Sequence, residues 1–174
     1  MFGHVDRPEH WARHLLAIRR LQADTGGFTE FVPLPFVHME APIFFKGRAR
    51  RGPTWREAVL MHAVARLVFG PLIPNVQASW VKMGIEGVKV CLQAGANDLG
   101  GTLMNESISR AAGSEHGEEL PPESLDAIIA SIGRRAEQRT TLYHKVPNQR
   151  RGVAYDATPL APIVKTPAVR HSRL

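Results

Sequence analysis

The feature that most constrains the fold of this chain is an alternation of short apolar runs with longer segments of helical periodicity. The apolar runs predict strands at residues 1–4, 28–32, 75–81 and 96–102. Segments with apolar residues three or four positions apart predict helices at about 6–25, 54–69, 85–93 and 122–143. Because strands separated by helices pair in parallel, the alternation predicts an α/β architecture.

Local signals place the helix ends. Asp6 is a candidate N-cap for the first helix, and the two glycines at 26–27 are expected to end it. Thr54 and Glu57 have the spacing of a capping box, which predicts a helix start there. Residues 38–53, with two glycines and two prolines, predict a long loop, and loops of this length are typical of functional segments.

The length of the chain limits this architecture to part of a barrel. A complete (β/α)₈ barrel needs about 250 residues, whereas the chain has 174. We therefore expect about half a barrel in residues 1–146, ending in a C-terminal helix. Residues 147–174 are basic, contain prolines and lack periodicity, so they predict a disordered tail. A free half-barrel exposes sheet edges and an apolar inner face, which favours association with another half.

Charge and cysteine content narrow the function classes. The net charge is +6, but residues 46–51 and the tail 147–174 each contribute +4, which leaves the rest slightly acidic. Because basic and aromatic residues do not interleave on one element, nucleic-acid binding is disfavoured. Cys91 is the only cysteine, so the chain has no internal disulfide. With no apolar run near 20 residues and no signal-peptide layout, we expect a cytoplasmic protein without a membrane span.

Four ordered blocks stand out along the sequence. They are Met-Phe-Gly-His at 1–4, Gly-Gly-Phe-Thr-Glu-Phe-Val-Pro-Leu-Pro-Phe-Val-His-Met-Glu at 26–40, Gln-Ala-Ser-Trp-Val-Lys-Met-Gly at 77–84, and Ala-Asn-Asp-Leu-Gly-Gly-Thr at 96–102 leading to Glu106. Together they resemble the FO synthase family, in particular its 5-amino-6-(D-ribitylamino)uracil–L-tyrosine 4-hydroxyphenyl transferase subunit or domain. The resemblance extends to about Arg151.

The resemblance implies a radical-SAM TIM-type barrel that uses S-adenosyl-L-methionine and a 4Fe–4S cluster. It implies coupling of the hydroxybenzyl group of tyrosine to 5-amino-6-(D-ribitylamino)uracil in deazaflavin coenzyme biosynthesis. The family holds its cluster on three cysteines in a CxxxCxxC pattern, and one cysteine cannot replace them. We therefore expect the C-terminal part of such an enzyme, inactive alone and dependent on an N-terminal half-barrel in the same or a separate chain.

Two alternatives stay open. The chain is either a non-catalytic half-barrel that docks onto a partner, or a fragment of a related enzyme of the menaquinone (futalosine) pathway. Enzymes of that pathway share the Thr-Gly-Gly-Phe block, whereas the loop at residues 35–42 is more similar to the deazaflavin enzymes.

The carboxyl ends of parallel strands hold the active-site groups of barrels, and this rule selects eight residues. We expect catalytic roles for Asp98, Glu106 and His4. The expected substrate-binding residues are Gln77, Ser79, Lys82, Asn97 and His38. No metal site is expected, because His10 and His14 have a suitable helical spacing but no third ligand.

Strand periodicity and side-chain chemistry suggest how these residues act. Gln77 and Ser79 share one face of a strand, where they are expected to bind uracil or ribityl groups. Lys82 is suited to neutralise a substrate carboxylate, and Asp98 to accept hydrogen bonds from ribityl hydroxyls or an amino group. Each has an ordinary structural alternative. Lys82 is alternatively a solvated lysine that begins a loop, and Asp98 is alternatively part of a turn-forming Asn-Asp pair.

Overall fold

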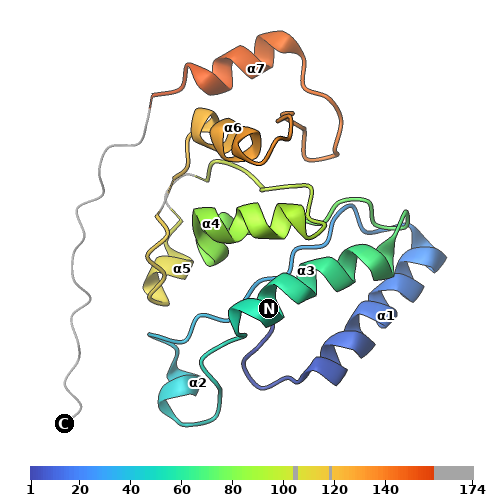
Figure 1. Ribbon diagram of the computed structural model, residues 1–174, viewed down its shortest axis with the longest axis vertical. Helices are drawn as coiled ribbons and strands as arrows, with labels where there is room; N and C mark the ends of the chain where they lie inside the picture. The colour runs from blue at the N-terminus through green and yellow to red at the C-terminus, as the bar shows by residue number, and fades with distance from the viewer. Residues whose placement is uncertain (104–105, 118, 159–174) are drawn as a thin grey trace.

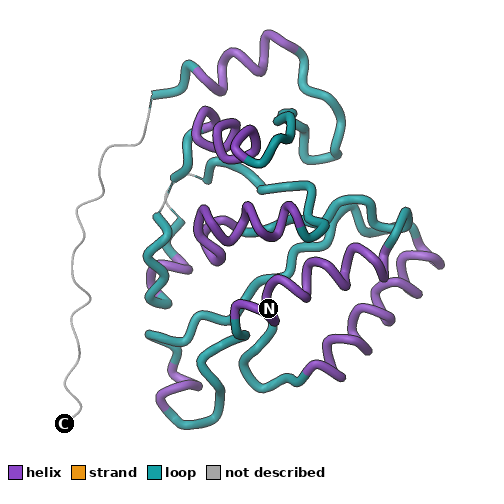
Figure 2. The backbone as a smooth tube through the Cα atoms, viewed as in Figure 1, coloured by secondary structure: helices purple, strands orange, loops and turns teal. Residues whose placement is uncertain are grey.

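A computed structural model describes residues 1–103, 106–117 and 119–158 of the chain, and helices account for most of its regular structure (Figures 1 and 2). The helices are α1 (Pro8–Thr25), α2 (Pro42–Phe45), α3 (Trp55–Phe69), α4 (Trp80–Gln93), α5 (Ile108–Ala111), α6 (Pro122–Ser131) and α7 (Asn148–Tyr155). The long helices α1, α3 and α4 coincide with three of the four predicted helical segments.

The extended segments between these helices pair in parallel and in chain order. The pairs are Phe2 with Pro35, Phe31 with Val76, and Gln77 with Asp98. The N–H of Phe31 donates to Asn75 O and the N–H of Gln77 donates to Phe31 O, both at 2.9 Å. The predicted parallel order is therefore confirmed. The predicted strands are reduced to isolated bridges in the described residues, and Pro33 and Pro35 contribute because they lack the N–H that a ladder needs.

The core lies between the extended segments and helices α1, α3 and α4. Phe69, Ile73, Val76 and Val88 are at most 1% exposed, and they bring α3, α4 and the third extended segment into one apolar cluster. Because Val76 and Ala78 are both buried in this cluster, the intervening Gln77 points to the opposite face. The same alternation that forms the core thus presents Gln77 away from the helices.

Several helix boundaries differ from the sequence predictions. The capping box of α3 is confirmed, since Thr54 Oγ1 accepts from Glu57 N at 3.2 Å and Glu57 Oε2 accepts from Thr54 N at 2.7 Å. Helix α4 begins at Trp80 instead of 85, with a kink at Gly84, whose φ is +66°. Asp6 is not the cap of α1, because Arg7 is the capping residue and the Asp6 carboxylate instead accepts from Gly3 N, His4 N and Trp11 Nε1.

The C-terminal helix is shorter than predicted. The prediction extended it to 143, whereas α6 ends at Ser131, and Gly133 follows with a φ of +72°. This left-handed conformation suits glycine and directs the chain out of the helix, with Gly133 N donating to Ala130 O and Arg134 N to Ile129 O. The chain then turns back on itself, so that Arg139 and Lys145 form an antiparallel bridge.

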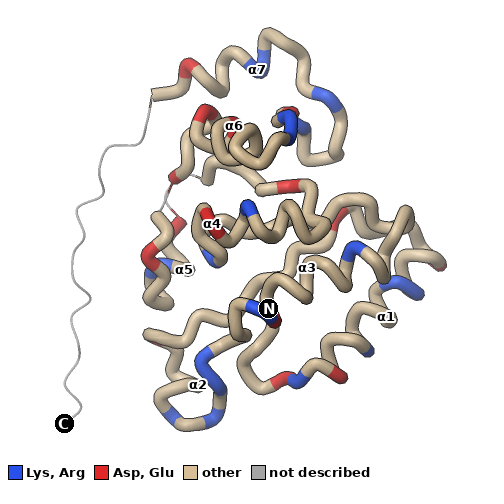
Figure 3. Tube along the Cα trace, viewed as in Figure 1, with Lys and Arg blue, Asp and Glu red and all other residues tan. Residues whose placement is uncertain are grey.

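The structure also differs in the predicted tail. Residues 148–155 form α7, and Tyr155 OH donates to Asp126 Oδ2 of α6 at 2.6 Å. Residues 159–174 lie outside the described part of the chain, and the division at residue 146 stays a prediction. The cationic loop at 46–51 follows α2 at the edge of the molecule (Figure 3), and its Arg50 Nη1 pairs with Glu57 Oε2 at 3.0 Å. None of the helices in the described ranges is long and apolar enough to cross a membrane.

His62 of α3 is a polar group enclosed in the core. Its ring is 0% exposed, and its Nδ1 lies 2.8 Å from Ala58 O, which places the proton of the neutral ring on Nδ1. Its Nε2 has no hydrogen-bond partner within the described residues. Burial lowers the pKa of His62 below its ordinary value of 6.5, because the core disfavours the imidazolium.

This buried ring predicts a loss of stability in acid. Below pH 6.5 the unfolded chain protonates His62 while the folded chain keeps it neutral, so the free energy of unfolding falls until the pH reaches the folded-state pKa. Urea unfolding from about pH 8 to about pH 5 is expected to show this fall in the unmodified chain and a weaker one in His62→Leu. The exposed His14→Leu is the matched control, and an equal pH dependence in His62→Leu would contradict the prediction.

Candidate functional site

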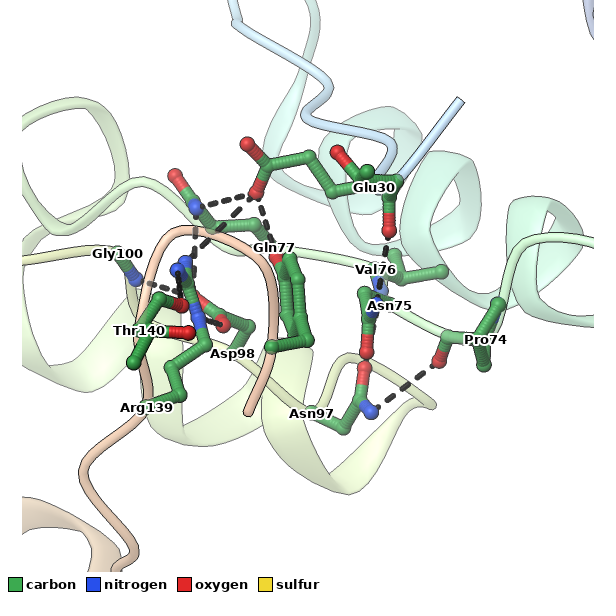
Figure 4. Close-up of polar contacts among 12 residues, drawn as sticks. Glu30, Pro74, Asn75, Val76, Gln77, Asn97, Asp98, Gly100, Arg139 and Thr140 are labelled. Carbon is green, nitrogen blue, oxygen red and sulfur yellow. Dashed lines mark hydrogen bonds and ion pairs between the residues drawn. The ribbon is translucent and has the colours of Figure 1, made fainter. Parts of the chain in front are cut away.

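Two carboxylates and one amide, those of Glu30, Asp98 and Gln77, meet where the extended segments lie side by side. Gln77 and Asp98 are directly paired in the parallel arrangement. The Gln77 amide donates from Nε2 to Asp98 Oδ1 at 3.2 Å and to Glu30 Oε2 at 2.9 Å (Figure 4). Gly100 N also donates to Asp98 Oδ1, at 2.5 Å. The carboxylates of Glu30 and Asp98 are therefore held on either side of one amide group.

The turn that follows α6 covers these carboxylates with two further side chains. Arg139 donates from Nη2 to Asp98 Oδ1 at 3.0 Å and from Nε to Asp98 Oδ2, which makes a bidentate pair (Figure 4). Tyr143 OH donates to Glu30 Oε2 at 2.6 Å, and the Arg139 guanidinium lies 4.1 Å from the centre of the Tyr143 ring. We call Glu30, Gln77, Asp98, Arg139 and Tyr143 the Asp98 cluster.

The electrostatics of the Asp98 cluster favour hydrogen-bond donors. Its two carboxylates face one guanidinium, so the cluster has an excess of acceptors. The hydrogen bond to Asp98 raises the pKa of Arg139, which keeps the guanidinium charged. Burial and the hydrogen bond to Glu30 raise the pKa of Tyr143, so its phenol stays protonated and remains a donor. A ligand that reaches this cluster is expected to bring hydroxyl or amino groups.

The structure brings a second pair of predicted residues together. Lys82, in the first turn of α4, and His38, after the second extended segment, line one cavity of about 260 Å³. The His38 ring lies edge-on to Phe44, with 4.7 Å between ring centres. Lys82 is partly buried, and burial lowers the pKa of its ammonium group although nearby Glu106 acts in the opposite direction.

The remaining predicted residues lie in separate places with internal contacts. Asn97 accepts from Val76 N at 2.9 Å and donates to Pro74 O at 3.2 Å (Figure 4). It also accepts from Arg66 Nη2 of α3 at 2.6 Å, so its side chain joins α3 to the paired segments. Ser79 is buried at the N-cap of α4. Their substrate-binding roles stay predictions.

Two of the expected catalytic residues also lie outside the Asp98 cluster. His4 Nδ1 lies 2.9 Å from Asp6 Oδ1, and its ring packs on Phe36 with 5.5 Å between centres. The Glu106 carboxylate accepts from Ser109 N at 3.0 Å at the start of α5. These contacts hold both groups in place, and their catalytic roles stay predictions.

Comparison with known proteins identifies the family. Residues 25–151 match the family described as the CofH/MqnC C-terminal region. The chain belongs to this family. The match includes Glu30, Gln77, Asp98, Arg139 and Tyr143, so the whole Asp98 cluster lies inside the family region.

Three relatives of this CofH/MqnC C-terminal chain are named as FO synthases or as the hydroxyphenyl transferase. It is 58% identical over 146 residues to the 5-amino-6-(D-ribitylamino)uracil–L-tyrosine 4-hydroxyphenyl transferase of Methanopyrus kandleri. The aligned region covers 84% of the chain and 40% of that protein. It is 53% identical over 154 residues to the FO synthase of Streptomyces avermitilis, covering 88% of the chain and 18% of the relative. The FO synthase of Mycobacterium tuberculosis is 54% identical over 143 residues, covering 82% and 17%.

These matches confirm the resemblance to the FO synthase family, and the chain spans 40% or less of the length of these relatives. Sequence reasoning missed Glu30, Arg139 and Tyr143. Glu30 lies within the block at 26–40, so that block contained a usable signal. No sequence signal marked Arg139 and Tyr143, because their four-residue spacing fitted the helix predicted over residues 122–143.

Proposed function

We propose that this chain is the C-terminal part of an FO-synthase-type radical-SAM enzyme that couples the hydroxybenzyl group of tyrosine to 5-amino-6-(D-ribitylamino)uracil. The observation that supports this function best is the acceptor-rich Asp98 cluster beside the paired segments, within the region shared with the family. The name of the 58% identical Methanopyrus kandleri relative states this reaction. The menaquinone-pathway alternative stays open, because the family description names two kinds of protein, CofH and MqnC.

Within the whole enzyme, we propose that the chain forms one half of the barrel. Four extended segments in parallel chain order, which share one apolar cluster with α1, α3 and α4, support this arrangement. The other half would come from an N-terminal part in the same or a separate chain. The greater length of the relatives supports that proposal.

The residues of this chain do not fit the 4Fe–4S cluster that the family implies. Cys91 is the only cysteine, and it is 0% exposed in the core. Burial raises the pKa of Cys91 to about 12, which opposes the thiolate form that iron requires. No group of three potential ligands is found among the described residues. Cluster binding and S-adenosyl-L-methionine cleavage are therefore assigned to the rest of the enzyme.

The Asp98 cluster has the chemistry to bind the ribitylaminouracil. The ribityl chain and the amino groups of this compound are rich in donors, and the carboxylates of Asp98 and Glu30 supply acceptors. The Gln77 amide bridges the two carboxylates and fixes their spacing. Arg139 holds the Asp98 side chain in one orientation, so less side-chain conformational entropy is lost when a ligand binds. Asp98 is thus the proposed ligand-contacting group and Arg139 a positioning residue.

Calorimetric titration of the chain with 5-amino-6-(D-ribitylamino)uracil tests this function. Asp98→Asn replaces an acceptor oxygen with a donor, so we expect it to weaken binding about tenfold or more, as for a hydrogen bond to a charged group. Asp126→Asn is the matched control, because Asp126 lies on α6 and contacts Tyr155 of α7, outside the Asp98 cluster. Equal affinity in the Asp98→Asn and unmodified chains would contradict the assignment. Binding of an isolated N-terminal half with no binding of the uracil would favour the interaction-module alternative.

A further inference from the structure

Glu30 is the more open of the two carboxylates in the Asp98 cluster. The next residue, Phe31, packs against the apolar core, and side chains alternate along an extended segment, so Glu30 faces the opposite side, as Gln77 does. The Glu30 side chain is 35% exposed, whereas that of Asp98, paired with the Arg139 guanidinium, is 7% exposed. A ligand that approaches this face therefore meets Glu30.

The contacts of the Glu30 carboxylate are concentrated on one of its two oxygens. Gln77 Nε2 and Tyr143 OH both donate to Oε2, at 2.9 Å and 2.6 Å. The Arg139 guanidinium lies on the same side, with its Nη2 3.8 Å from Oε2. Figure 4 shows the other oxygen, Oε1, pointing away from these contacts. Because each carboxylate oxygen can accept hydrogen bonds, Oε1 is available to a donor from outside the chain.

Tyr143 reaches Glu30 from an unusual backbone conformation. Its φ is +61°, and Leu103 is the only other non-glycine residue with a positive φ in the described ranges. Tyr143 ends a turn in which its N–H donates to Thr140 O at 3.0 Å. Left-handed backbone is disfavoured for residues that carry a Cβ, and hairpin turns usually place glycine or asparagine there. A tyrosine that keeps this conformation, with its hydroxyl on a carboxylate, points to a role for the side chain itself.

We propose that Glu30 is a second ligand-contacting residue of the Asp98 cluster, whose Oε1 accepts from a hydroxyl or amino group, and that Tyr143 is its positioning residue. The Tyr143 phenol and the Gln77 amide hold Oε2, so the carboxylate is ordered before the ligand arrives and less side-chain entropy is lost on binding. The donor-rich class of ligand follows from these acceptors alone, whereas naming 5-amino-6-(D-ribitylamino)uracil rests on the proposed function.

Calorimetric titration of 5-amino-6-(D-ribitylamino)uracil into variants of the chain tests both roles, with circular dichroism to check that each variant is folded. Glu30→Gln removes the charge of the acceptor and is expected to weaken binding about tenfold or more. Tyr143→Phe removes only the hydroxyl that orders Glu30 and is expected to weaken binding about threefold. Tyr155→Phe is the matched control, because its hydroxyl also donates to a carboxylate at 2.6 Å, that of Asp126 outside the Asp98 cluster, so affinity should not change.

The double variant separates positioning from a merely structural role. If Tyr143 acts through Glu30, adding Tyr143→Phe to Glu30→Gln is expected to cause no further loss of affinity. A second threefold loss in the double variant, or unchanged affinity in Tyr143→Phe alone, would overturn the positioning role. Unchanged affinity in Glu30→Gln beside the expected loss in Asp98→Asn would overturn the contact with Glu30 and leave the proposed function standing. No binding of the compound to the unmodified chain would overturn both.

Discussion

Arg139→Met is expected to lower the free energy of unfolding by about 3 kcal/mol, the lower end of the range for breaking a buried ion pair. The Asp98 side chain is only 7% exposed, whereas that of Arg139 is 25% exposed, so water compensates part of the loss. Without the guanidinium, Asp98 keeps two donors, Gln77 and Gly100, but no cation within the Asp98 cluster. Urea unfolding at neutral pH measures the difference.

A double-mutant cycle separates this pair from general disruption. Combining Arg139→Met with Asp98→Asn removes both charges, so we expect the double variant to be more stable than Arg139→Met alone. Lys145→Met is the control in the same turn, because its pair with Glu137 is exposed and should leave the unfolding midpoint within error. If the double variant were no more stable than Arg139→Met, the unpaired Asp98 carboxylate would not be the cause of the lost stability.

Phe69→Ala is expected to lower the free energy of unfolding by about 3–5 kcal/mol, as for other large-to-small changes in a core. Phe69 is 1% exposed at the end of α3, and its ring lies edge-on to Phe31, with 4.8 Å between centres. Phe31 belongs to the segment that pairs with Val76, so the lost ring leaves a cavity between α3 and the paired segments. Chemical unfolding followed by circular dichroism measures the change.

Leu67→Ala provides the comparison for Phe69→Ala. Leu67 is on the same helix but 81% exposed, so its truncation removes little buried surface and is expected to change stability by less than about 0.5 kcal/mol. If the two variants lost equal stability, the apolar cluster around Phe69 would not be the core of the folded chain.

Local chemistry explains which parts of the fold were predictable. The capping box at Thr54 and Glu57, followed by a regular apolar stripe, predicted α3 because each signal acts within one or two turns of helix. The pairing of Gln77 with Asp98 was also within reach, because neighbouring parallel strands bring equivalent positions together. The early end of α6 was not predicted, because Gly133 overrode the apolar pattern around it. No local signal indicated that the predicted strands would pair only as isolated bridges in the described residues.

The sequence by itself determined the family, the order of helices and extended segments, and two of the five members of the Asp98 cluster. These features depend on periodicity, capping and motifs, which are local or shared with relatives. Only the tertiary structure decided that Arg139 binds Asp98, 41 residues earlier, and that Tyr143 binds Glu30, 113 residues earlier. Such contacts form because the turn after α6 folds back over the paired segments, and the buried Asp98 carboxylate there requires donors that no local pattern specifies.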